Sequence, residues 1–256
     1  GPAYQNGAVD TSAPSAFHAD APVTLRSLSY NNNYLSFTLL PQSGHYFGRT
    51  VAVTYNGKEY TVVKLGTVFS KNNNITSVTI AEGTTELSRA AFQNDSNLVS
   101  VSLPSTLTKM DMQVFYNCVS LKEVTIPGAL AKLDDTQFTS CTSLSKLVIE
   151  DGSEPLVITA SAFTSGGLSN LKELVLNRAM VATLPAAAPF RGLKNLESVT
   201  IGGSALAFSA STFENCSALK NVVFNNQPTE FGTSMFANTG LESFDFPASI
   251  STVPAS

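Results

Sequence analysis

Tryptophan is absent from the sequence, and charged residues are scarce: Lys, Arg, Asp and Glu make up 13% of its 256 positions. The usual share in folded proteins is roughly 25%. The net charge is −4 and the basic residues form no cluster, which argues against a nucleic-acid partner, because phosphate binding needs clustered cations. No apolar run reaches the roughly 18 residues that a membrane-spanning helix needs. We therefore predict a folded protein with no membrane span and a polar, weakly charged surface.

Cysteine is also scarce, and its count of three excludes a fully paired disulfide framework. Cys118, Cys141 and Cys216 each precede a leucine by three residues. This shared position predicts buried free thiols that pack as small hydrophobic groups. Cys118 and Cys141 are expected on adjacent turns of the fold, where a disulfide between them stays geometrically possible.

The sequence shows no pattern typical of a catalytic or cofactor site. No Gly-rich phosphate loop follows a predicted strand, and an enzyme would need a cleft that gathers His45 with carboxylates. The acidic stretch at residues 150–155 (EDGSEP) could hold a cation, but it lacks the spacing of an EF-hand loop. We therefore predict no catalytic residue, no metal site and no cofactor, and we do not expect an enzyme.

What the sequence does contain is a repeat. Phenylalanine recurs at intervals of 23, 23, 23, 25, 27, 23 and 23 residues, and each copy is followed by a six-residue run of the form L-x-x-V-x-I. The phenylalanines are Phe69, Phe92, Phe115, Phe138, Phe163, Phe190, Phe213 and Phe236. The runs begin at Ile75, Leu98, Leu121, Leu144, Leu171, Leu196, Leu219 and Leu241. One such unit cannot bury its own apolar face, so the repeat predicts a solenoid of stacked turns.

Within each run the alternation of side chains predicts a strand of a parallel sheet. Leu121, Val124 and Ile126 should point inward, while Glu123 and Thr125 should point outward. A second apolar residue, five positions before most of the phenylalanines, should complete the opposite wall of the core. These residues are Leu87, Met110, Leu133, Ile158, Phe208 and Phe231, with Leu184 six positions before Phe190. The longer intervals in the middle predict small loop insertions at residues 150–155, 165–167 and 185–189.

The sequence divides into three parts. Residues 1–22, which open with what looks like a tag scar, are expected to be a flexible lead-in or tether. Residues 23–66 contain β-prone runs around Asn56-Gly57, a strong hairpin signal, and are predicted to form an antiparallel β cap that covers the open end of the stack. Residues 67–256 are the repeats, the last of them incomplete.

The repeat resembles the BspA-like, or treponemal-type, leucine-rich repeats. Residues 115–127 (FYNCVSLKEVTIP) match nearly every position of that family's 23-residue unit, and residues 138–144 and 213–219 match its first half. The resemblance covers about residues 50–256. It implies a right-handed superhelix of about eight leucine-rich repeats of ~23 residues, with a parallel β-sheet on one face. It also implies a bacterial surface or secreted protein, often adhesive, without fixed catalytic residues.

The outward strand positions form the candidate binding face, because the faces of solenoids are common interaction surfaces. It comprises Ser100, Ser102, Glu123, Thr125, Lys146, Val148, Glu173, Val175, Ser198 and Thr200. The leading hypothesis is a non-catalytic adhesion or interaction module that binds a protein or a glycan through this face. The alternative is a structural spacer within a larger surface protein. We expect a monomer, secreted or held at the cell surface (outer membrane) by a lipid anchor ahead of residue 1.

Overall fold

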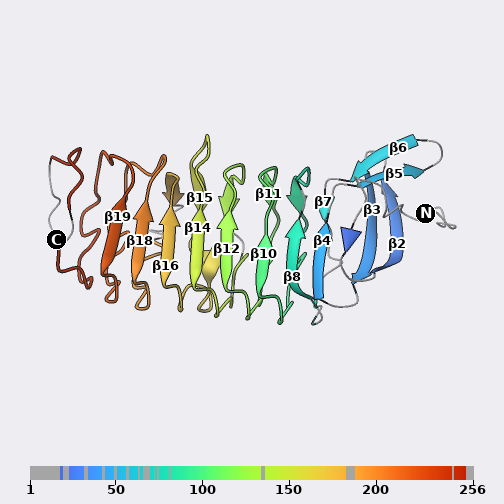
Figure 1. The fold of residues 1–256 in the computed structure, drawn as a ribbon, viewed down its shortest axis with the longest axis horizontal. Helices are drawn as coiled ribbons and strands as arrows, with labels where there is room; N and C mark the ends of the chain where they lie inside the picture. Colours follow the sequence, from blue (N-terminus) through green and yellow to red (C-terminus); the bar gives the residue numbers. More distant parts are fainter. Residues whose placement is uncertain are drawn as a thin grey trace.

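The computed structural model describes residues 18–19, 23–31, 34–41, 44–48, 51–55, 58–62, 64–65, 70–71, 73, 75–80, 82–133, 136–182, 188–243 and 245–251. These residues form an elongated stack of solenoid turns, with the first strands and the last turns at opposite ends of the long axis (Figure 1). Among the described residues the only helix is a single 3-10 turn, η2 (Ala160–Phe163). The predicted solenoid is confirmed.

One long sheet runs the length of the stack. Its order is β1-β4-β8-β10-β12-β14-β16-β18-β19, and all neighbouring strands from β4 onward are parallel. The strands are β1 (His18–Ala19), β4 (Gly44–Gly48), β8 (Ile75–Ile80), β10 (Ser100–Ser102), β12 (Glu123–Ile126), β14 (Lys146–Ile149), β16 (Glu173–Leu176), β18 (Ser198–Ile201) and β19 (Asn221–Phe224). Seven of the eight expected runs therefore form strands. The described residues of the run that begins at Leu241 form none, so the expected repeat count of about eight is slightly too high.

The N-terminal part contains the expected antiparallel pairs. Strands β2 (Val23–Asn31) and β3 (Tyr34–Pro41) pair with each other, as do β5 (Val51–Tyr55) and β6 (Lys58–Val62). Strand β4 is a strand that the sequence did not indicate, because its glycines and the preceding proline resemble a turn. It pairs in parallel with β8 and so begins the long sheet; pairing with a neighbour outweighs weak local propensity. The boundaries at residues 22 and 66 stay predictions.

Short strands form the opposite wall. They are β7 (Lys64–Leu65), β9 (Glu86–Leu87), β11 (Lys109–Met110), β13 (Lys132–Leu133), β15 (Leu156–Ile158) and β17 (Met180–Ala182), in two three-stranded parallel sheets. Leu87, Leu133 and Ile158 point into the core and are fully buried, as predicted. The register of β15 and β17 pairs Ile158 with Ala182, and Leu184, which was expected to complete this wall before Phe190, lies outside the described residues.

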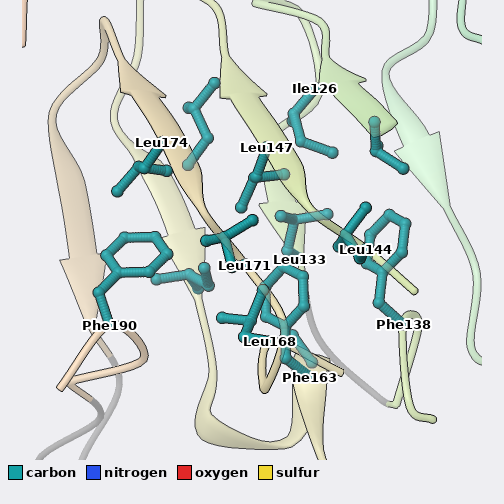
Figure 2. Packing of buried hydrophobic residues seen from close by; sticks show 14 of the residues in the cluster. Ile126, Leu133, Phe138, Leu144, Leu147, Phe163, Leu168, Leu171, Leu174 and Phe190 are labelled. Carbon is teal, nitrogen blue, oxygen red and sulfur yellow. The ribbon is translucent and has the colours of Figure 1, made fainter. Parts of the chain in front are cut away.

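The phenylalanines fill the core as stacked rings. Phe92, Phe115, Phe138 and Phe163 stack with centroids 5.3–5.4 Å apart. Figure 2 shows Phe138 and Phe163 beneath leucines of the sheet, such as Leu147, and Phe190 standing apart from them. A second stack continues through Phe190, Phe213 and Phe236, at 6.2 and 5.8 Å. The break between the stacks coincides with the lengthened repeats.

A left-handed residue follows each phenylalanine by two positions. All eight have positive φ: Lys71, Asn94, Asn117, Ser140, Ser165, Gly192, Asn215 and Asn238. Asparagine and glycine favour this conformation, which explains why Asn recurs after Phe. The turns also bond to one another, since Asn117 Nδ2 donates to Asn94 Oδ1 at 2.9 Å and the Asn94 N–H donates to the Tyr116 carbonyl at 2.8 Å.

The cysteines lie one residue further along. All three are free and buried, as predicted. Each thiol also donates to the carbonyl of a phenylalanine one turn earlier: Cys118 to Phe92, Cys141 to Phe115 and Cys216 to Phe190, at 3.0–3.1 Å. Burial raises the pKa of the Cys141 thiol to about 12, which makes it a poor nucleophile at neutral pH.

Candidate functional site

The ten residues of the candidate face lie in two straight rows on the outer side of the long sheet. The ladder places Ser100 beside Glu123, Glu123 beside Lys146, and Lys146 beside Glu173. Glu173 pairs in turn with Ser198. These five residues form the charged row. The inward residues between the rows, such as Val124 and Leu147, are fully buried, so the alternation expected from sequence fixes which side chains reach solvent.

The second row, two residues further along each strand, is largely β-branched. It runs from Ser102 through Thr125, Val148, Val175 and Thr200, with register pairs that join Thr125 to Val148 and Val175 to Thr200. We call these five residues the β-branched row. Val148 and Val175 are half-buried by their neighbours. Beyond Thr200 the row reaches Val223, whose side chain is 52% exposed.

Lys146 is the electrostatic centre of the charged row. Its Nζ lies 3.7 Å from Oε1 of Glu173 and 4.0 Å from Oε1 of Glu123. One ammonium between two carboxylates leaves this part of the face with a net charge of about −1. Since these side chains are partly exposed, the ion pairs add little to stability, on the order of 0–1 kcal/mol each. These ion pairs hold the charged side chains in order along the row. Because the pairs are weak, the charged groups can still bind to a partner.

The acidic loop at residues 150–155 has bonding partners of its own. Asp151 accepts hydrogen bonds from Ser204 Oγ at 2.7 Å and from the Gly152 N–H at 2.9 Å, and these bonds lower the pKa of its carboxyl. Gly203 allows the close approach, since a Cβ there would collide with the Asn177 carbonyl oxygen. In the part of the chain that the structure describes, no three His, Cys, Asp or Glu residues gather as a metal site would require.

Arg178 was not singled out by the sequence, yet it is the most unusual side chain in the core. It is 1% exposed. Its Nε donates to the Glu154 carbonyl at 2.8 Å, Nη1 to the Pro127 carbonyl at 3.3 Å, and Nη2 to the Leu130 carbonyl. Burial lowers the pKa of Arg178, and the nearby Asp151 carboxylate opposes that shift. Arg178 therefore ties its own turn to two preceding turns, which is a structural role.

The family model of the BspA type leucine-rich repeat region matches residues 66–183 and 157–256, in six copies. These matches cover well over half of the chain. The protein therefore belongs to the BspA-type leucine-rich repeat family.

Solved structures of bacterial proteins are similar to this chain. A leucine-rich repeat protein from Eubacterium ventriosum is 22% identical with a TM-score of 0.51, over 76% of this chain and 51% of that one. One from T. pallidum is 18% identical, with a TM-score of 0.47, over 83% of this chain and 85% of that one. A leucine-rich cell surface protein from Faecalibacterium prausnitzii is 15% identical, with a TM-score of 0.27, over 81% and 96%. The first of these supports the leucine-rich repeat fold.

No curated protein matches this sequence. Across the residues that the structure describes, no helix has the length and apolar character needed to cross a membrane.

Proposed function

We propose that the chain is a non-catalytic interaction module that binds a protein partner through the middle of its long sheet. The observation that carries this proposal is that the charged row, centred on Lys146, lies beside the β-branched row around Val148 and Val175 on the same face of the sheet. An apolar strip with charges beside it has the anatomy of a protein interface, in which burial supplies affinity and the charges set specificity and register.

A protein fits this part of the face better than a glycan does. None of the ten residues of the candidate face is aromatic, so its two rows offer no flat ring on which a sugar could stack. The valines instead present methyl groups at the strand spacing of about 4.8 Å, which suits the side chains of a partner polypeptide. A surface or secreted location in bacteria and a monomeric state belong to the same proposal, and the location is suggested by membership of the repeat family.

Charge placed in the β-branched row tests the proposal. The variants Val148→Glu and Val175→Glu should each weaken binding to a partner found on an array of extracellular-matrix proteins by tenfold or more, because a carboxylate would have to be desolvated in the interface. Val181→Glu is the matched control. Val181 is 48% exposed on the opposite wall, and its substitution should leave binding unchanged. Equal binding by all three variants would move the site away from the long sheet.

The alternative function is a structural spacer, in which the stack of turns sets a length. It is favoured by the elongated arrangement of the turns (Figure 1). A spacer would bind no array protein and would tolerate removal of one whole 23-residue repeat, such as residues 115–137. Deletion of that repeat removes Glu123 and Thr125 from the face, so an interaction module should lose its partner.

A further inference from the structure

A hollow of about 560 Å³ lies beside β19, the last strand of the long sheet among the described residues, and is lined on its other side by Ser243 and residues 245–248. Elsewhere along the stack each run pairs with the strand before it, as β19 does with β18 through four register pairs. The run that begins at Leu241 keeps the sequence pattern, but its described residues form no strand. The space that a paired strand would close is therefore open, and its volume lies within the range of about 300–1,000 Å³ typical of small-molecule sites.

The lining of the hollow mixes apolar side chains with polar ones and contains one acidic and one basic residue. Asn221 projects from β19, and Ser243 and Asp245 come from the facing segment. These side chains offer amide, hydroxyl and carboxylate groups, which together can both donate and accept hydrogen bonds. The single Asp245 carboxylate and the single Lys220 ammonium in the lining form neither a metal site nor an anion site, because both need several groups of one sign or type.

Two aromatic side chains, Phe224 and Phe246, complete the lining, and Phe246 is the more exposed of the two. Phe246 takes the position of Ile149 and Ile201 in earlier turns, which are fully buried, but it is 46% exposed. Its centroid lies 6.0 Å from that of Phe231, at an angle of 42°, so one part of the ring is packed and another part faces the hollow. An aromatic surface beside hydrogen-bonding side chains presents an apolar body next to polar groups.

We propose that this hollow binds a neutral saccharide unit of a glycan. A sugar ring has an apolar face of C–H groups, which would lie on Phe246, and an edge of hydroxyls, which would bond to Asn221 and Asp245. This site is separate from the middle of the face: it involves β19 and the segment that follows it, whereas the proposed protein site is centred on β14 and β16. It goes beyond the proposed function, and either one can hold without the other.

The test is a titration of the intact chain, followed by NMR, with glucose, galactose, mannose, N-acetylglucosamine, lactose, cellobiose and diacetylchitobiose. We expect at least one of these sugars to bind and to shift the resonances of residues 220–227 and 243–248. Asn221→Ala and Phe246→Leu should each weaken binding by tenfold or more. Asn221 is exposed, so its variant folds even if the replacement of Phe246 disturbs the last turn.

Two controls separate the outcomes. Ser100→Ala lies in the same row as Asn221 but far along the sheet, and should leave sugar affinity unchanged. Val148→Glu should also leave sugar affinity unchanged while it weakens protein binding by tenfold or more, so failure of one proposal is distinguishable from failure of the other. Absence of binding to every sugar, equal binding by the Asn221 and Ser100 variants, or shifts confined to other residues would each overturn the assignment.

Discussion

At the scale of single residues, Arg178 illustrates how much one side chain can tie together. Its guanidinium satisfies the carbonyls of Pro127, Leu130 and Glu154, which would otherwise be left without these donors. Nearby, Asp151, whose carboxylate interacts with Arg178, accepts a hydrogen bond from Ser204, 53 positions later in the sequence. Because a buried charge without partners is costly, these contacts are what make an arginine acceptable inside a leucine-rich core.

Replacement of Arg178 by methionine should lower the free energy of unfolding by about 3–5 kcal/mol, because several buried carbonyls lose their donor at once. Arg191→Met is the control. Arg191 is exposed and pairs with Glu214 at 2.9 Å, and its loss should cost less than about 1 kcal/mol. Denaturant unfolding of both variants measures the difference, and similar losses would contradict the structural role of Arg178.

The buried Cys141 thiol should make the folded protein less stable at alkaline pH. The Cys141 pKa of about 12 in the folded state exceeds the value of roughly 8.5 expected in the unfolded chain. Between these values the unfolded chain loses a proton that the folded protein keeps, so stability is full below about pH 8.5 and falls as the pH rises. Cys141→Ala should flatten this fall by up to about 1.4 kcal/mol per pH unit. Unfolding curves from pH 7 to 10.5 that stay parallel for both proteins would be evidence against it.

At the scale of elements, each turn is stabilised by the packing of its core side chains against those of the adjacent turns. Phe138 lies between Phe115 and Phe163, at 5.3 Å from each, whereas Ser100 in the charged row is exposed. We expect Phe138→Ala to cost about 3–5 kcal/mol of unfolding free energy. Ser100→Ala, on an exposed position of the sheet, should change it by less than about 0.5 kcal/mol. Equal effects in thermal or denaturant unfolding would show that the inward and outward positions are misassigned.

The elements also show where sequence reasoning succeeds. The repeat predicted the strands that begin near Leu121, Leu144 and Leu171. One short apolar run does not by itself indicate a strand, but eight copies in the same register do. The same repetition hides exceptions. Arg178 occurs in one repeat only, at a position where the other repeats have small or polar residues, so the pattern does not indicate that it is buried. Strand β4 lies outside the repeats and depends on pairing with β8. The hollow lies between β19 and a run that has the right pattern but whose described residues form no strand, which the pattern alone does not predict.

At the scale of the whole molecule, the core comprises two phenylalanine stacks that are joined by a continuous sheet. The lengthened repeats separate Phe163 from Phe190, while β14, β16 and β18 keep full register across the same region. The candidate face is therefore uninterrupted in the region where the stacking of the phenylalanine rings is interrupted. The candidate face could be predicted from alternation alone, but its use as a binding surface could not, because solvated and occupied sheet faces share the same pattern of residues.

The parallel ladders also determine how the molecule would respond to a mechanical pull. Each turn forms hydrogen bonds chiefly with the turns on either side, as in other repeat proteins. Tension along the long axis would therefore separate neighbouring turns one after another. Each 23-residue turn that comes loose would release about 75 Å of extended chain while the turns behind it stay folded. In the proposed surface location, such stepwise unfolding would absorb a sudden load over a long extension and spare the contact with the proposed partner.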